Sequence, residues 1–130
     1  MDIDDFQKIL EVITEEIPEE LFRELNGGVI VLPEFKLHPE SQNPCLYTMG
    51  EYRTQVPGLG RYIVIYYGSF MRVFGAGADP QRIRRELRKT LRHEFRHHIE
   101  TLAGAKDLLI EDKLNLLKYR RSAGSKKDQT

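Results

Sequence analysis

The chain has 130 residues, with 20 Lys and Arg balanced by 20 Asp and Glu, so its formal net charge is zero. A neutral chain of this length suits one folded domain and has no overall attraction to nucleic acid or to an anionic membrane. No apolar run approaches the length of a membrane span, and the acidic start is unlike a signal peptide. We therefore expect a soluble single domain over residues 1–121 and a disordered polar tail over 122–130.

The chain has one cysteine, Cys45, which excludes an internal disulfide. Proteins without disulfides are typical of reducing compartments, so we expect a cytoplasmic location. Cys45 follows a proline and has no supporting histidine nearby in the sequence. We interpret it as a small apolar residue rather than a reactive thiol.

The first third of the chain predicts two helices and a strand. Apolar residues at helical spacing predict an amphipathic helix over residues 4–16, and Pro18 begins a second, short helix that runs to Leu25. The β-branched run over 29–32, closed by a proline, predicts a strand.

The middle of the chain predicts a loop followed by two more strands. Residues 33–44 carry three prolines and few apolar side chains, which is typical of a loop. Residues 46–52 and 61–67 predict strands, and both alternating faces of the second are apolar or aromatic, as in a strand covered on both sides. Residues 69–74 fit either a helix or an extended segment.

A long helix is predicted over residues 80–103. Asp79 followed by Pro80 is a typical helix start, and Gly104 is a typical stop. A projection around the helix axis gathers one apolar stripe, which consists of Ile83, Leu87, Leu91, His98 and Leu102. A last helix is predicted over 107–121.

The opposite face of the long helix carries the sequence H-E-x-x-H over residues 93–97. His93 and His97 are four residues apart, so both imidazoles can point at one metal ion, with Glu94 beside the ion rather than on it. Two histidine nitrogens, a third protein ligand and a carboxylate that takes a proton from water make up a hydrolytic zinc site. The pattern therefore predicts one Zn²⁺ ion, with Glu94 as general base. Because His98 falls in the apolar stripe, we expect it to be a core imidazole bonded to backbone or to a carboxylate.

From residue 29 through 63–68 to the doubled histidine at 97–98, the chain resembles the minimal zincin-like metallopeptidases, a family of small bacterial H-E-x-x-H proteins. The resemblance implies an α+β fold in which a small mixed sheet packs on a long active-site helix with flanking helices. It also implies a zinc-dependent peptidase that acts on a peptide or protein substrate.

The chain departs from the family after the second histidine. Members often continue H-x-x-G-x-x-D, where the aspartate is the third ligand, whereas this chain has Glu100 and Ala103 at those two positions. Glu100 is about 10 Å along the helix from His93, so a bond to His97 suits it better than metal ligation. Asp107 keeps the spacing from Gly104 but lies one helical turn further on, where it can also cap the last helix.

If the last two helices form an antiparallel hairpin, residues 111 and 112 of the last helix lie at about the same height along the hairpin as His97. Glu111 is then the first candidate for the third ligand and Asp112 the second, while both also fit as solvent-facing helix charges. A further oxyanion donor is expected from Tyr66, Tyr67 or Arg96.

Two other functions stay open at this point. The first is a zincin-like protein that keeps the fold without catalysis. The second is a nucleic-acid or partner-binding module, because the long helix is rich in arginine. The zero net charge argues against nucleic acid, and we expect the arginines to pair with the acidic N-terminal region, which includes Glu15, Glu16, Glu19 and Glu20.

Overall fold

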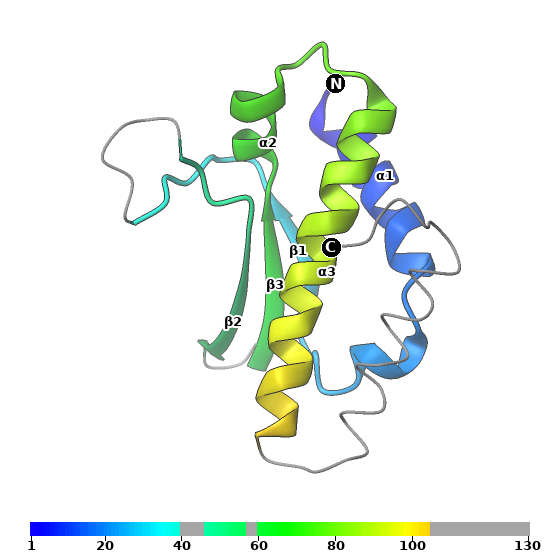
Figure 1. Ribbon diagram of the computed structural model, residues 1–130, viewed down its shortest axis with the longest axis vertical. Coiled ribbons are helices and arrows are strands. Elements are labelled where there is room, and N and C mark those ends of the chain that lie inside the picture. Colours follow the sequence, from blue (N-terminus) through cyan, green and yellow to red (C-terminus); the bar gives the residue numbers. More distant parts are fainter. Residues whose placement is uncertain (40–45, 57–59, 105–130) are drawn as a thin grey trace.

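The computed structural model describes residues 1–39, 46–56 and 60–104, with the side chains of 55 and 56 left out. The fold is α+β, with a small mixed sheet beside helices (Figure 1). The predicted last helix over 107–121 and the tail over 122–130 lie outside the described residues. Within the described part, no helix combines the length and the apolar character that crossing a membrane requires.

Helix α1 spans Ile3–Glu15 and confirms the first predicted helix. The Asp2 side chain accepts a hydrogen bond from the Asp5 backbone N–H and so caps the first turn. Its buried face consists of Phe6, Leu10 and Ile13, at spacings of four and three.

The second predicted helix, over 18–25, is wrong in type and length. Only Glu19–Phe22 is helical, as the 3₁₀ turn η1. Arg23 is already extended, with ψ of 132°, and Glu24 has a positive φ of 63°. An α-helix cannot pass through these two backbone conformations, so the chain turns there toward the first strand.

The sheet has three strands: β1 at Gly28–Leu32, β2 at Gly50–Val56 and β3 at Gly60–Tyr66. Their order is β1-β3-β2, with β1 parallel and β2 antiparallel to β3. The sheet is therefore mixed, as predicted, and β2 forms one of its edges.

The predicted strand over 46–52 begins four residues too early. Residues 46–48 pair instead with residues 36–38 of the predicted loop, through a bridge between Leu37 and Tyr47. The Thr48 N–H donates to the Lys36 carbonyl at 2.7 Å, and the His38 N–H donates to the Leu46 carbonyl at 3.1 Å. This local pairing uses the apolar residues that the sequence pattern assigned to the sheet.

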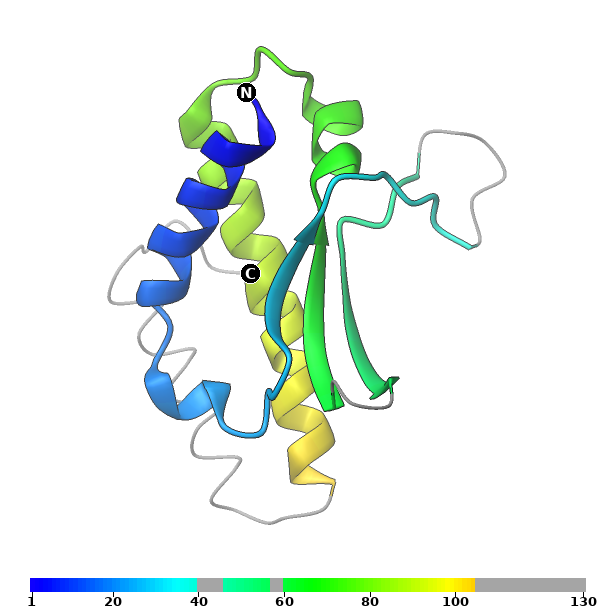
Figure 2. The same ribbon diagram turned by 180° about the vertical axis from the view of Figure 1, so that it is seen from behind.

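The two faces of β3 belong to two different apolar clusters. Ile63 and Ile65 join the main core with α1 and α3, whereas Tyr62, Val64 and Tyr66 point to the other face of the sheet. This alternation has the two-residue period of a strand. As Figures 1 and 2 show, α3 lies against the sheet and α1 lies beside α3 on the same side.

Helix α2 spans Tyr67–Phe74, so the undecided segment over 69–74 is helical. It follows β3 without a loop. The Gly68 N–H donates to the Glu34 carbonyl, and a Cβ at position 68 would lie 2.5 Å from the carbonyl carbon of Glu34. Only glycine allows the two backbones to cross this closely.

Helix α3 spans Pro80–Ala103 and confirms both predicted ends. The Asp79 side chain accepts a hydrogen bond from the Gln81 N–H, and Pro80 opens the helix. The predicted apolar stripe is buried along its whole length: Ile83, Leu87, Leu91 and His98 are 0% exposed and Leu102 is 4% exposed. This burial fixes the rotation of α3 and so decides where its polar face points.

Candidate metal centre

The two predicted metal ligands face one another on α3. The Nε2 atoms of His93 and His97 are 3.1 Å apart, and both side chains are exposed to solvent. The ring centroids are 4.6 Å apart, with an angle of 88° between the ring planes. The helical spacing thus brings the two nitrogens together, as the sequence predicts.

This separation fits a shared zinc ion. Two nitrogens that each lie about 2.05 Å from one tetrahedral zinc ion are about 3.3 Å apart. The observed 3.1 Å differs from that value by a few tenths of an ångström. Neighbouring groups remove part of the water around the His93 ring and so lower its pKa, with further lowering from His97 and Arg96 and an opposing effect of Glu100. A lowered pKa keeps the imidazole neutral, and metal binding requires the neutral form.

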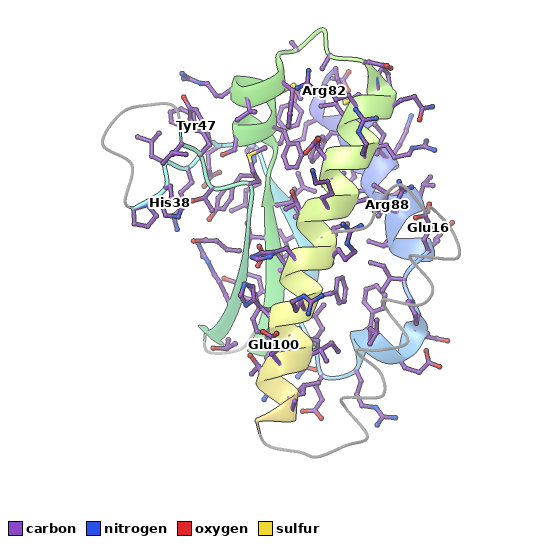
Figure 3. The ribbon with its side chains drawn as sticks, in the orientation of Figure 1. Glu16, His38, Tyr47, Arg82, Arg88 and Glu100 are labelled. Carbon is purple, nitrogen blue, oxygen red and sulfur yellow. The ribbon has the colours of Figure 1, made fainter. Side chains whose placement is uncertain are left out.

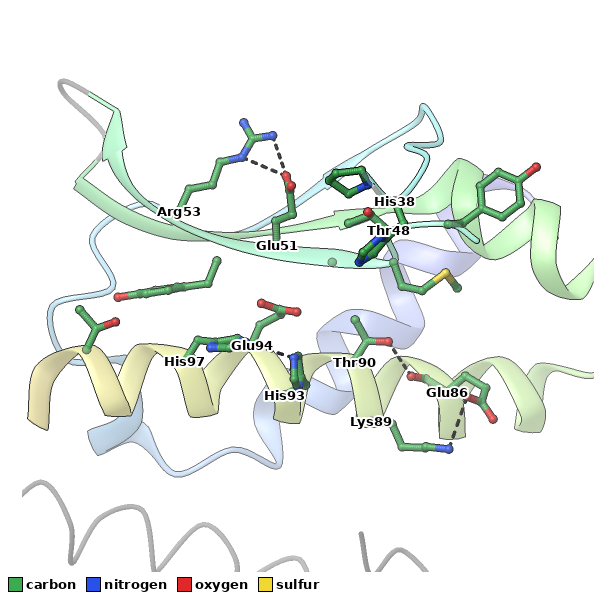
Figure 4. A pocket seen from close by; sticks show the side chains of 16 residues that line it. His38, Thr48, Glu51, Arg53, Glu86, Lys89, Thr90, His93, Glu94 and His97 are labelled. Atoms are coloured by element: carbon green, nitrogen blue, oxygen red, sulfur yellow. Dashed lines mark hydrogen bonds and ion pairs between the residues drawn. The ribbon is translucent and has the colours of Figure 1, made fainter. Parts of the chain in front are cut away.

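Glu94 is buried beside these histidines, with 6% of its surface exposed. Figure 4 shows its carboxyl group pointing from α3 toward β2. Burial raises the pKa of Glu94 from 4.5 to about 7, and the negative charge of Glu51 adds to the rise. A carboxylate with a pKa near neutrality can both accept and return a proton at physiological pH.

None of the described residues joins His93 and His97 as a third candidate ligand. Within residues 1–39, 46–56 and 60–104, no three His, Cys, Asp or Glu side chains come together as a metal-binding group. Glu100 lies in this part and is exposed. Asp107, Glu111 and Asp112 lie outside it, so the choice among them stays a prediction.

His98 is a core residue, as predicted. Its Nε2 lies 2.8 Å from the Arg23 carbonyl and its Nδ1 lies 2.7 Å from the Tyr52 hydroxyl. Since a carbonyl only accepts, Nε2 carries the proton and Nδ1 accepts from Tyr52. Burial lowers the pKa of His98, although its bond to Arg23 opposes this. His98 therefore joins the end of η1, β2 and α3, and its ring nitrogens are committed to that role.

A groove of about 740 Å³ runs between β2 and α3 and contains the H-E-x-x-H side chains (Figure 4). Its α3 wall includes Glu86, Thr90, His93, Glu94 and His97. Its other wall comes from β2 and from the segments that precede it, and includes His38, Thr48, Glu51, Tyr52 and Arg53.

The groove is narrow at Gly50. A Cβ at this position would lie 2.8 Å from the Thr90 Cγ2 and 3.2 Å from the Val64 carbonyl oxygen. Real Cβ atoms do not approach other atoms this closely. Glycine at position 50 therefore lets β2 approach α3 one helical turn before His93.

A charged network that the sequence analysis missed lies around Glu51, on the β2 wall. Figure 4 shows Glu51 and Arg53 on the far side of β2 from Glu94. Glu51 accepts hydrogen bonds from Lys36 at 2.5 Å, Arg53 at 2.7 Å and the Tyr66 hydroxyl at 2.7 Å. Burial by itself would raise the pKa of Glu51, but bonds from Lys36, Tyr66 and Arg53 outweigh it and lower the pKa to about 2.

Two of the three predicted oxyanion donors, Tyr66 and Tyr67, already donate hydrogen bonds to other groups of the chain. The Tyr66 hydroxyl donates to Glu51, and its pKa rises to about 12 through burial and this bond. The Tyr67 hydroxyl donates to the Met1 carbonyl. Adjacent strand residues point to opposite faces, and Tyr66 takes the face away from α3. Arg96, on α3 itself, stays a candidate.

No family model matches the sequence, and no curated protein matches it. A solved structure does match: a conserved hypothetical protein from Thermus thermophilus is 38% identical, with 81% of this chain and 100% of that chain covered at a TM-score of 0.69. This chain belongs to the same family. Its relative is described only as a conserved hypothetical protein. Family membership therefore supports the fold, and the chemistry of the site rests on the residues of this member.

The basic face of this family member is partly neutralised. The Arg88 guanidinium pairs with Glu16 at 3.0 Å, and both residues are labelled in Figure 3. This confirms one of the expected pairings with the acidic N-terminal region. The Arg82 guanidinium lies 4.9 Å from the centre of the Phe74 ring. Lys89 is 3.7 Å from Glu86.

Proposed function

We propose that this protein is a zinc-dependent metallopeptidase with Glu94 as its general base. One observation carries the proposal: two imidazole nitrogens face each other at 3.1 Å beside a buried carboxyl group. The resemblance to zincin-like metallopeptidases supports the same reaction. The α+β arrangement agrees with that resemblance, although many functions use such folds.

His93 and His97 would hold the ion through Nε2, and a residue from the segment after Gly104 would complete its ligands. Glu111 is the first candidate and Asp112 the second, because both would lie at the level of His97 if the chain after Gly104 returns as a helix antiparallel to α3. Both lie outside the described residues. A carboxylate from either would give the two-histidine, one-carboxylate ligand set found in catalytic zinc sites.

Glu94 would move the proton during hydrolysis. When bound, a zinc ion supplies two effects, since it polarises a carbonyl group and acidifies a water molecule. Glu94 accepts the proton of the attacking water, and then gives it to the amine that leaves when the peptide bond breaks. Its raised pKa of about 7 suits both halves of this transfer.

The groove suits an extended polypeptide. β2 is an edge strand, so one side of its backbone has no neighbouring strand in the described sheet. A peptide that adds to this edge would bind mainly through backbone groups, which gives affinity with little side-chain selectivity. The same placement would carry its carbonyl groups past Glu94, because the groove lies between β2 and α3.

The two other functions have weaker support. An arginine-rich helix that binds nucleic acid needs cations directed to solvent, whereas Arg88 and Lys89 contact carboxylates of the chain. A zincin-like protein without catalysis has the same site, and activity alone separates it from an enzyme.

The proposal is tested on full-length protein purified without a histidine tag. We expect about one zinc per chain by mass spectrometry of the metal content, and loss of that zinc in His93→Ala and His97→Ala. We also expect cleavage of an unfolded protein substrate such as labelled casein, which chelation of zinc abolishes. Zinc binding without cleavage would favour the inactive alternative, and absence of zinc from the parent protein would refute the proposal.

A further inference from the structure

Two short segments at the α2 end of the groove form a fixed antiparallel pair. We call residues 35–39 and 46–49 the paired arms. The Lys36 N–H donates to the Ser69 hydroxyl oxygen of α2 at 3.0 Å, and the Lys36 ammonium group bonds to Glu51 of β2. Figure 3 shows the arms, with His38 and Tyr47 labelled, projecting to one side of the sheet. Contacts to α2 and to β2 therefore hold the base of the arms in place.

The paired arms expose large apolar side chains. Phe35 is 41% exposed, Leu37 45% and Leu46 54%. In the described part of the chain, only Val12 and Val73 are comparable large apolar residues with such exposure. Exposed apolar residues are ordinary when scattered, but several on one small element indicate a binding surface.

The three large apolar side chains that the arms expose lie outside the groove, but other apolar residues of the arms line it. Pro39, Tyr47 and Met49 of the arms line the groove that also contains His93 and Glu94. The Tyr47 ring packs edge-on against Phe35, with centroids 5.8 Å apart and planes at 78°. The Arg72 guanidinium of α2 lies 4.2 Å from the centre of the Phe35 ring and supports it in turn. Tyr47 thus presents a positioned aromatic surface at the end of the groove.

The charged groups around this end are paired with one another. Lys89 lies 3.7 Å from Glu86 on α3, and Lys36 and Arg53 both contact Glu51. The charges of Glu86 and Lys89 cancel on α3, and the one positive charge left by two cations that share Glu51 lies on the far side of β2 (Figure 4). An apolar side chain gains most at this end, because it covers exposed apolar surface without stripping water from an unpaired charge.

We propose that Pro39, Tyr47 and Met49 form a subsite for one bulky apolar side chain, aromatic or leucine-like, of an extended polypeptide. This deepens the proposed function and rests on it for the link to cleavage. Glu86 lies on α3 at the same end of the groove as the arms (Figure 4). From Glu86 to His93 the helix rises about 10 Å, which an extended peptide covers in about three residues. The selected side chain is therefore about three positions from the peptide bond that faces Glu94.

Binding tests the subsite without catalysis. The full chain carrying Glu94→Gln is titrated into two fluorescein-labelled twelve-residue peptides of Ala, Ser and Gly, identical except that one has a central Phe where the other has Ala. We expect the Phe peptide to bind about ten-fold more tightly by fluorescence anisotropy, because the aromatic side chain buries apolar surface that Ala lacks. Tyr47→Ser and Pro39→Ser should each reduce this preference, and Tyr47→Phe should keep it.

Val12→Ser is the matched control, since it removes an exposed apolar side chain from α1, away from the groove. It should leave the Phe preference unchanged. Equal binding of both peptides, no binding of either, or a preference that survives Tyr47→Ser and Pro39→Ser would overturn the subsite. A dimer that Leu37→Ser dissociates without a change in peptide preference would assign the arms to a second copy, and would also overturn it.

The outcomes for the subsite and for the proposed function are separate. A Phe preference in a protein that binds no zinc would retain the subsite and remove the peptidase proposal. Zinc-dependent cleavage that ignores apolar residues would retain the peptidase proposal and remove the subsite.

Discussion

The carboxyl group of Glu94 points from α3 toward β2, that of Glu51 lies on the far side of β2, and the two have opposite acid strengths. Glu94 on α3 is buried, and the pKa of its carboxyl group rises to about 7. Glu51 on β2 accepts hydrogen bonds from Lys36, Arg53 and Tyr66, and its pKa falls to about 2. Two identical side chains thus differ because one is desolvated and the other is bonded in its charged form. The comparison supports the proposal that Glu94 transfers protons, and it indicates that Glu51 keeps its negative charge near neutral pH.

The largest expected effect separates the two carboxylates by activity. Glu94→Gln should lower kcat/KM for an unfolded protein substrate by a factor on the order of 10²–10⁴, the usual contribution of a general base. Glu51→Gln is the matched substitution on the other wall, and should lower it by much less. Zinc content should stay at the parent level in both variants. Equal losses of activity in the two variants would contradict the assignment of roles.

The next effect concerns the carboxylate that we propose as the third zinc ligand. Glu111→Gln should weaken zinc binding by about ten-fold or more, because even residues that only orient metal ligands contribute about 10–100-fold. Competition with a chelator of known affinity measures this. Glu20→Gln, which changes an exposed carboxylate of η1, is the control and should leave zinc affinity unchanged. If Asp112→Asn shows the larger loss, the ligand is one residue further along.

Zinc-free Glu94→Gln should be more stable than the parent at high pH. Because the pKa of Glu94 is raised, the folded protein holds a proton that the unfolded chain releases from about pH 4.5. Parent stability therefore falls as the pH rises from about 4.5 to 7. One pKa unit corresponds to about 1.4 kcal/mol, so the variant should gain up to about 3 kcal/mol at pH 8 and nothing below about pH 4. Urea unfolding of the two proteins at pH 4 and pH 8 measures this difference. Equal stabilities at pH 8 would contradict the burial of Glu94 as the cause of its raised pKa.

Glu51→Gln should lower the free energy of unfolding, which is the opposite of the effect of Glu94→Gln, and by a smaller amount. The pKa of Glu51 is lowered, so its stabilisation is complete above about pH 4.5 and disappears as the pH falls toward 2. Its side chain is 26% exposed, so solvent screens part of these interactions. We therefore expect the free energy of unfolding at pH 7 to fall by about 2 kcal/mol. Urea unfolding at pH 7 and pH 3 should show the loss shrinking with acid. Glu24→Gln, in an exposed pair with Arg61, should cost less than about 1 kcal/mol.

The α3 wall was predictable from the sequence because its signals are local. Asp79 and Pro80 mark the helix start within adjacent residues, and the four-residue spacing of His93 and His97 places both rings on one face. The apolar stripe fixes the rotation of the helix, which also identified His98 as a core residue. The expectation that Glu94 lies beside the histidines follows from the same geometry.

The β2 wall was not predictable from the sequence to the same degree. Glu51 meets Lys36 and Tyr66, both 15 residues away, through strand pairing that no local pattern encodes. The same non-local pairing moved the start of β2 to Gly50, because residues 46–48 pair with the preceding arm instead. The alternation of charged and aromatic residues over 51–53 was the available signal, since it indicates a strand with two different faces.

The close approach at Gly50 has a consequence for engineering. Because a methyl group there would meet Thr90 at 2.8 Å, the gap between strand and helix depends on one hydrogen atom in place of a side chain. The double substitution Gly50→Ala and Thr90→Ser would change the width of the groove. Every acidic, basic and histidine side chain would stay in the chain. The size of the side chains that the groove admits can therefore be changed without altering His93, Glu94 or His97.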